Sequence, residues 1–274
     1  MDLPADAGIA VAGPGDDTDV GPSTTLRGAA TSSTRGRMVR EAGSVTSRLS
    51  PSARTTVVRG DRARTDRGAL HDVLASGVIC HLGVVVDAVP LVLPTSYGYD
   101  LDGPDRDGTL YLHGSVAARS LLEAPEQTVC VTISVVDGLV LARSGFHHSM
   151  NYRSAVLIGV PRQVTDHAER EWALETLVDH LVPGRTATLR PHTRKELAAT
   201  VVLALPLHEA SVKVRDGDPI DDPVDVAEPV WAGVLPLRTA ADNPVPSADC
   251  LAGLPVPSDV QARAQTSMRS ASSS

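Results

Sequence analysis

With 274 residues, the chain is long enough for one large domain or two small ones, and its apolar share of 42% is ordinary for a globular protein. Its formal net charge of -8 comes from interspersed acidic and basic residues, which argues against a nucleic-acid-binding stripe and a polybasic membrane patch. The cysteines Cys80, Cys130 and Cys250 form no C-x-x-C pair, so we expect buried thiols in a reducing compartment. The sequence has no apolar run of about 18 residues and no signal-peptide pattern, which predicts a cytoplasmic protein.

Both ends of the chain have the composition of disordered segments. Residues 1–52 are rich in Gly, Ala, Ser, Thr, Pro and Asp and show no apolar periodicity. We therefore predict a disordered N-terminal segment over residues 1–52, and we expect its removal to leave the fold intact. Met1 and Met38 are both candidate starts of translation. After Arg238 the content of Pro, Ala and Ser rises again, which predicts a second disordered segment over residues 239–274.

The first ordered elements are predicted to be a helix and a hairpin. The helix should begin after Asp66, a residue type that caps helices, and end at Gly77. Two β-branched runs, residues 78–86 and 89–93, are separated by Asp87-Ala88 and should pair as a hairpin. The hydroxyl-bearing residues after the second run are candidate ligand contacts, and a solvent-facing position on an amphipathic strand explains them equally well. They are Thr95, Ser96, Tyr97 and Tyr99.

The next segment contains a candidate phosphate site. Residues 100–108 alternate carboxylates around a glycine but lack the closing Glu of a calcium loop, so we interpret them as a hairpin loop. A strand is predicted over residues 109–113, after which Ser115 should cap a helix. Because a helix N-terminus presents free N–H groups, His113, Ser115 and Arg119 could hold a phosphate there. The alternative is a capped helix with an exposed Arg119.

A polar and aromatic segment follows a second predicted hairpin. The apolar run 129–136 leads into Asp137-Gly138, a strong two-residue hairpin signal. The polar segment after this hairpin is predicted to be a loop, and it forms either a hydrogen-bonded corner or a ligand wall. Adjacent histidines diverge on an extended backbone, so we predict no metal site there. The side chains in this loop are Phe146, His147, His148, Asn151, Tyr152 and Arg153.

Two helices are predicted in the second half of the chain. Capping-box patterns begin at Asp166 and Thr193. We expect His167 and His180 of the first helix to face solvent. The same helix is predicted to bury Trp172, Leu174, Leu177, Val178 and Leu181.

The predicted strands outnumber the helices. Further strands are expected over residues 201–205 and 211–215, with the apolar segment 230–237 packed against the sheet elements. Because hairpins rather than helical crossovers join most strands, we predict a mainly β protein, an antiparallel β-barrel with peripheral helices. The sequence has no G-x-G-x-x-G, Walker lysine loop, H-E-x-x-H or nucleophile elbow, which disfavours a Rossmann fold.

Six motifs together resemble the flavin-nucleotide-binding family related to pyridoxamine 5'-phosphate oxidase, and within it the nitroimidazole-resistance-protein-like branch. They are C-H-L-G-V-V-V-D-A-V-P at 80–90, P-T-S-Y-G at 94–98, L-Y-L-H-G-S-V-A-A-R at 110–119, F-H-H-S-M-N-Y-R-S at 146–154, A-S-V-K-V-R-D-G-D-P at 210–219 and W-A-G-V-L-P-L at 231–237. The resemblance implies an FMN-binding split β-barrel domain over residues 53–238.

The resemblance also implies a homodimer that holds one FMN at each of two sites across the interface. The P-T-S-Y strand should lie beside the flavin ring, the next helix start beside the phosphate, and the later polar loop should complete the pocket. Where related nitroimidazole-reductase-like proteins carry G-R-K, this chain has Ala118, Arg119 and Ser120, so Arg119 is expected to replace the family lysine. The implied cofactor-binding residues are Pro94, Thr95, Ser96, Tyr97, His113, Ser115, Arg119, His148, Asn151, Tyr152 and Arg153.

Three functional hypotheses are compatible with these residues. The first is an FMN-dependent oxidoreductase or reductase acting on a small molecule, with His113 and His148 as candidate proton donors. The second is a non-enzymatic flavin or haem carrier or sensor with the same pocket. The third is a barrel that binds an apolar ligand without a redox cofactor. Since the family lysine is replaced, another flavin, a deazaflavin or haem is an alternative to FMN.

Overall fold

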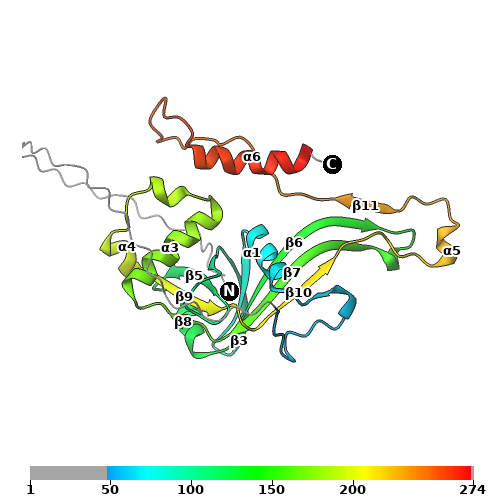
Figure 1. Ribbon diagram of the computed structural model, residues 1–274, viewed down its shortest axis with the longest axis horizontal. Helices are drawn as coiled ribbons and strands as arrows, with labels where there is room; N and C mark the ends of the chain where they lie inside the picture. The colour runs from blue at the N-terminus through cyan, green and yellow to red at the C-terminus, as the bar shows by residue number, and fades with distance from the viewer. Residues whose placement is uncertain (1–47, 273–274) are drawn as a thin grey trace, which may run out of the picture. The chain divides into compact units, whose positions relative to one another are not determined.

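The computed structural model describes residues 48–272, and most of the segment predicted to be disordered, residues 1–52, lies outside them. The strands of the described chain form two antiparallel sheets (Figure 1). The larger sheet has the order β1-β10-β7-β6-β2-β3, and β11 pairs with the last part of β6. Its strands are β1 (Ala63–Arg64), β2 (Cys80–Val86), β3 (Val89–Thr95), β6 (Val129–Leu141), β7 (Ser149–Gly159), β10 (Ala210–Arg215) and β11 (Gly233–Pro236).

The smaller sheet has the order β4-β5-β9-β8, and the helices lie outside the two sheets. This arrangement confirms the mainly antiparallel β fold with peripheral helices. Every helix in residues 48–272 is too short or too polar to cross a membrane. The remaining elements are β4 (Gly98–Asp100), β5 (Thr109–Ser115), β8 (Arg162–Gln163), β9 (Thr200–Pro206), α1 (Arg67–Ser76), α2 (Arg119–Glu123), α3 (His167–Leu181), α4 (Arg194–Ala199), α5 (Pro223–Val226) and α6 (Ser258–Ser272).

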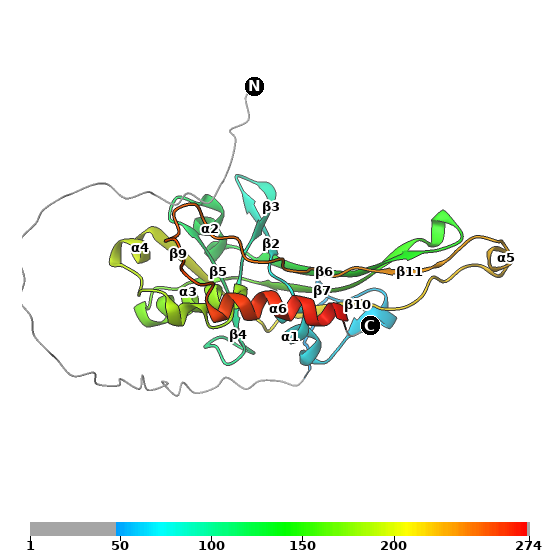
Figure 2. The same ribbon diagram turned by 90° about the horizontal axis from the view of Figure 1, so that it is seen from above.

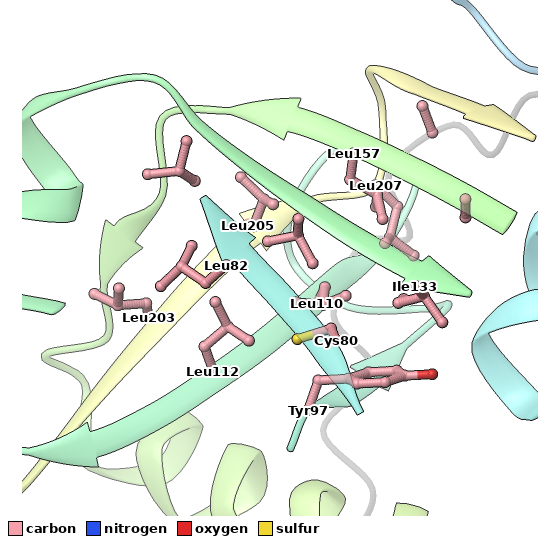
Figure 3. Close-up of a cluster of buried hydrophobic side chains, with 14 of the residues drawn as sticks. Cys80, Leu82, Tyr97, Leu110, Leu112, Ile133, Leu157, Leu203, Leu205 and Leu207 are labelled. Atoms are coloured by element: carbon pink, nitrogen blue, oxygen red, sulfur yellow. The ribbon is translucent and has the colours of Figure 1, made fainter. Parts of the chain in front are cut away.

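Side chains from both sheets meet in one apolar core. In β2, residues alternate between buried and more exposed positions, and Cys80 and Leu82 are among the buried ones. Figure 3 shows these two residues in a cluster with Leu157 of the larger sheet and Leu110 and Leu205 of the smaller one. Burying each leucine contributes about 1.5–3 kcal/mol, so this cluster holds the two sheets together.

Strand β9 is buried on both faces. Its residues Leu203 and Leu205 belong to the core between the sheets, whereas Val202 and Ala204 belong to a second cluster with residues of α3 and α4. Because both faces of β9 are buried, its sequence is a continuous apolar run and does not alternate between apolar and polar residues. The second cluster also holds Tyr111 of β5, so α3 and α4 cover the outer face of the smaller sheet.

Several local predictions are confirmed. The Asp66 side chain accepts a hydrogen bond from the backbone N–H of Ala69, which caps α1 as predicted. The hairpin of β2 and β3 turns at Asp87 and Ala88, with φ values of 51° and 61°. A reciprocal capping box at the start of α4 involves Thr193.

The predicted hairpin at Asp137-Gly138 is wrong. Strand β6 runs through both residues, and the irregularity between Val136 and Gly138 is absorbed as a bulge in its pairing with β7. The chain reverses only at residues 142–148. Beyond the bulge β6 pairs with β7 on one edge and with β11 on the other, so a strand from far along the chain holds it extended. Both views show β6, β7 and β11 running together (Figures 1 and 2).

Two predictions about polar segments are also wrong. Ser115 does not cap a helix, because it is the last residue of β5, and α2 begins after Ala118 without a side-chain cap. Asn151, Tyr152 and Arg153 do not lie in a loop. They belong to β7, where their backbones pair with β6 and hold them in an extended ladder.

Surface assignments on α3 differ from the prediction as well. Trp172 is 51% exposed because its indole N–H reaches outward to Asp100, and Leu181 at the end of the helix is exposed too. His180 is partly buried instead of solvated: its Nε2–H donates to the carbonyl of Gly77 at 2.8 Å. Of the thiols predicted to be buried, Cys80 is buried, whereas Cys250 is exposed in the segment before α6.

The described chain contains only part of the two segments that we predicted to be disordered. Leu49 is 7% exposed, and its backbone N–H donates to Thr65 at 2.8 Å. Ser52 donates a hydrogen bond to Glu209. Residues 48–52 therefore pack on the sheet, so a truncation that removes them should destabilise the fold, contrary to our expectation. The segment predicted to be disordered after Arg238 carries helix α6, and the domain limits at 53 and 238 stay predictions.

Replacing Tyr97 by Phe should lower the free energy of unfolding by about 1–3 kcal/mol. The Tyr97 hydroxyl is fully buried and lies 2.7 Å and 2.9 Å from the carbonyl oxygens of Leu74 and Gly77. The hydroxyl has one proton to donate, so its removal leaves a buried carbonyl oxygen without that donor. Urea unfolding of the variant measures the loss. Tyr99→Phe is the control, because the Tyr99 hydroxyl makes no hydrogen bond within the described chain, and equal losses for the two variants would contradict the assignment.

Candidate functional site

The P-T-S-Y segment forms the end of β3 and the connection to β4. Thr95 pairs with Cys80 of β2, and Ser96 is half-buried. Tyr97 is fully buried, with its hydroxyl directed at the carboxyl end of α1. A ligand beside this segment would therefore meet Pro94, Thr95 and Ser96, while Tyr97 supports the segment from the core.

Strand β3 presents an apolar edge of the larger sheet. Val89, Leu91 and Val92 are 54%, 37% and 67% exposed, and β3 has a neighbour only on its β2 side among the described strands. A pocket of about 250 Å³ lies between β2, β3 and β6, and its lining includes Leu91, Val92 and Cys130. An exposed apolar edge strand favours covering by another chain or a ligand.

Of the two histidines in the predicted site, His113 is the more buried one. It shares a face of β5 with Tyr111, because side chains two residues apart on a strand point the same way. Its Nδ1 atom is buried and has no hydrogen-bond partner among the described residues. Burial lowers the pKa of His113 below its usual value, so the imidazole is neutral at pH 7. A neutral imidazole with an unpaired nitrogen can hydrogen-bond a ligand or bind a metal.

Arg119 is directed to carboxylates. Its guanidinium donates to both oxygens of Asp87 at 2.7 Å and to Glu123 at 2.8 Å, and all three side chains are substantially exposed. The pKa of Arg119 is raised by the hydrogen bonds to Asp87 and Glu123. Arg119 thus lies at the β2–β3 turn, and no contact joins it to His113 or Ser115 within the described chain.

The residues predicted near the β6–β7 turn are held by internal partners. The Nδ1–H of His148 donates to the carbonyl of Ser144 at 2.9 Å, and Asn151 donates to the carbonyl of Gly217 at 3.1 Å. Arg153 donates to both oxygens of Asp137 at 2.9 Å and to the hydroxyl of Ser76 at 2.8 Å. Ser76 ends α1 next to Gly77, so Arg153 approaches the Tyr97 segment, whereas His148 remains at the turn.

The family follows from a comparison with known proteins. The family model described as pyridoxamine 5'-phosphate oxidase matches residues 66–214, which is more than half of the chain. This chain belongs to the pyridoxamine 5'-phosphate oxidase family. The match includes β2 to β9 and most of β10, so the split barrel of this family is the fold described above.

Two solved proteins resemble the chain over nearly their whole length. The flavocytochrome Anf3 from Azotobacter vinelandii is 38% identical, with 78% of this chain and 98% of that chain covered and a TM-score of 0.72. The FAD and haem binding protein from Mycobacterium smegmatis is 37% identical, with coverages of 74% and 97% and a TM-score of 0.68. No curated protein matches the chain.

The predicted nitroimidazole-resistance-like branch has weaker support within the family. A 5-nitroimidazole antibiotic resistance protein from Bacteroides thetaiotaomicron is 22% identical, with 56% of this chain and 86% of that chain covered and a TM-score of 0.45. That likeness is distant, and the branch stays a prediction, whereas the family rests on the match over residues 66–214.

One polar group of this family member was missed by the sequence analysis. His147 in the β6–β7 turn lies with Asp222 and Asp225 at α5, and one ligand atom from each lies within 4.8 Å of the other two. The His147 Nε2 atom is 3.3 Å from Asp222 Oδ2, which is the geometry of an ion pair when the histidine is protonated. No local signal could find this group, because the carboxylates come from a segment far along the chain.

Proposed function

We propose that this chain binds a flavin and a haem and acts as a redox carrier or sensor. The observation that carries the proposal is the 37–38% identity to a flavocytochrome and to a FAD and haem binding protein, both covered almost completely. A bound flavin would supply hydride or electron transfer, and a bound haem would supply one-electron transfer. The protein would provide binding, orientation and exclusion of water.

His113 fits a haem. Haem iron is commonly held by a neutral histidine nitrogen, and His113 combines a lowered pKa with a buried nitrogen that lacks a partner. Four side chains of the described residues carry such a buried unpartnered atom, and His113 is the one histidine among them. His148 and His180 each donate one ring N–H to a backbone carbonyl, which leaves their second ring nitrogen available, so His113 is distinguished from them by its buried nitrogen without a partner.

The flavin would bind along Pro94, Thr95 and Ser96. The relatives name FAD, so FAD comes before the predicted FMN in this proposal, with FMN and a deazaflavin as the alternatives. The buried Tyr97 fixes this backbone segment to α1, which gives a flat ring a rigid wall. The phosphate end remains assigned to Arg119.

Replacing Arg119 by Ala should weaken the binding of FAD and FMN roughly ten-fold to a hundred-fold, since a charge-assisted hydrogen bond contributes about 1.5–3 kcal/mol. The exposed contacts of Arg119 with Asp87 and Glu123 contribute little, so a phosphate could replace them at small cost. Riboflavin, which lacks the phosphate, should bind the variant as it binds the wild type. Titrations followed by flavin fluorescence give the dissociation constants of FAD, FMN and riboflavin for the variant and the wild type.

The control is Arg190→Ala, because Arg190 is also an exposed arginine paired with a glutamate. It should leave all three affinities unchanged. Equal losses for riboflavin and FAD in Arg119→Ala would move Arg119 from the phosphate to the ring or to the fold.

The homodimer is part of this proposal. The exposed apolar residues of β3 support it, because a sheet edge of this kind is stabilised by covering from a second chain. Light scattering at micromolar concentration should report twice the mass of the chain. A monodisperse monomer that binds flavin stoichiometrically would contradict the dimer.

A flavin-dependent oxidoreductase acting on a small molecule is the second candidate, and the description of the matching family supports it. Addition of reduced nicotinamide to the purified holoprotein separates the two functions. A carrier or sensor should be reduced once, in proportion to its cofactors. Continuous turnover with a small-molecule acceptor would favour the enzyme.

A further inference from the structure

A second pocket lies away from the proposed cofactor residues. It has a volume of about 360 Å³ and lies between residues 54–62 and the strands β7 and β10. Both views show this early segment beside β10 (Figures 1 and 2). None of Pro94, Thr95, Ser96, His113 and Arg119 lines it.

The lining of this pocket is strongly cationic. Arg54, Arg59, Arg62 and Lys213 contribute to it, and no acidic residue does. The chain as a whole has a net charge of -8 and only two lysines, so this is a local concentration of positive charge. Four cations around one small volume repel one another, and an anion between them would relieve that repulsion.

The charges are only partly compensated by the protein. Arg54 pairs with Glu209 at 2.8 Å, whereas the nearest carboxylate oxygen to Arg62 is that of Asp61 at 3.9 Å. Arg59 has no carboxylate partner within residues 48–272. The Lys213 ammonium lies 5.5 Å from the centre of the Tyr152 ring. Cationic groups therefore remain available to a ligand.

Two of the cations share the pocket from different elements. Arg62 comes from the segment before β1 and Lys213 from β10, and both line the pocket. Burial acts to raise the pKa of the neighbouring Tyr152 hydroxyl, but the proximity of Lys213 and Arg62 lowers it. Hydroxyls also line the pocket, and Ser211 makes no side-chain hydrogen bond within the described chain.

We propose that this pocket binds the phosphate groups of a nucleotide-sized phosphate ester. Guanidinium groups match phosphate oxygens in pairs, and lysine adds a point charge. The volume falls within the range of about 300–1,000 Å³ that is common for small-molecule sites. Val57, Val58 and Val156 in the lining offer an apolar wall to a base or another ring. None of the residues proposed for the flavin or the haem lines this pocket, so the proposal does not depend on the proposed function.

Calorimetric titration of the full-length protein, with its cofactors saturated, tests the site with ADP, inorganic pyrophosphate and adenosine as probes. ADP and pyrophosphate should bind, adenosine should not, and the affinity should fall as salt is added. Tighter binding of ADP than of pyrophosphate would identify an organic phosphate as the source, and equal binding would identify free phosphate. Saturation with flavin keeps ADP out of the cofactor site.

Two variants test whether the phosphate probes bind in this pocket. Arg59→Gln changes an exposed residue that should not affect folding, and Lys213→Gln changes the cation on β10. Each should weaken ADP binding roughly ten-fold or more. Lys195→Gln, which changes the second of the two lysines, should leave it unchanged. Failure of the wild type to bind either phosphate probe, or binding that survives both pocket variants, would overturn the proposal.

Discussion

Replacing Asp107 by Asn should lower the free energy of unfolding by about 3–5 kcal/mol, because it removes one charge from a buried ion pair. Asp107 and Arg67 are 0% and 2% exposed at the side chain, and their charged atoms lie 3.1 Å apart. Asp107 also lies 2.6 Å from the Nδ1 atom of His208, and Arg67 donates to the carbonyl of Leu207 at 3.0 Å. These contacts attach α1 to the β4–β5 and β9–β10 loops, which lie at the same end of the smaller sheet, so a fall in melting temperature on the order of 10 °C is expected.

The matched control is Asp87→Asn. Asp87 has a positive φ of 51°, close to the 64° of Asp107, and it too pairs with an arginine. Asn tolerates this backbone conformation in both places, so the two variants differ in burial. Because exposed ion pairs stabilise little, Asp87→Asn should leave the melting temperature almost unchanged. Similar losses for the two variants would show that backbone strain, not the buried charge, decides the outcome.

Replacing His113 by Ala should weaken haem binding at least ten-fold. Loss of a residue that merely orients a metal ligand typically costs about ten-fold to a hundred-fold in metal affinity, and loss of the ligand itself should cost no less. Titration of the haem-free protein with haemin, followed by the visible absorption band of bound haem, gives the affinity. Flavin affinity, measured on the same sample by fluorescence, should be retained.

Two other histidines serve as controls for His113. His148→Ala tests the second candidate from the sequence, whose Nδ1–H donates to the Ser144 carbonyl, and His192→Ala tests a half-buried histidine outside the proposed site. Both variants should bind haem as the wild type does. Loss of haem in His148→Ala with retention in His113→Ala would transfer the ligand to the β6–β7 turn.

The fold could be predicted from the sequence where neighbouring residues determine the backbone. Asp66 caps α1 through an N–H three residues away, and Asp87-Ala88 turns a hairpin between adjacent runs. The prediction of a hairpin at Asp137-Gly138 was wrong because a distant segment, and not the neighbouring residues, determines the backbone there. There β11, a strand from far along the chain, pairs with β6 and keeps it extended. Propensity is a local preference, and long-range pairing outweighs it.

The sequence could predict which residue types belong to the candidate site, but it could not predict how their side chains are arranged in space. His113 and Arg119 are close in sequence, yet Arg119 is directed by Asp87 of another hairpin, a contact that spacing cannot reveal. Trp172 was assigned to the core by its apolar character, although its N–H finds Asp100 at the surface. The identity of the cofactor is harder still to predict from the sequence, because the walls of the pocket determine it. The family motifs alone pointed to FMN and to nitroimidazole-like chemistry.

The visible absorption spectrum of the purified protein, with mass analysis of the released cofactors, tests the central claim most directly. The account predicts flavin and haem bands together, and the masses of FAD and of haem in the released fraction. Flavin without haem, even after incubation with haemin, would contradict the proposed carrier or sensor and favour the flavin-dependent oxidoreductase. A protein that stays colourless after incubation with FAD, FMN and haemin would contradict both and favour a barrel that binds an apolar ligand.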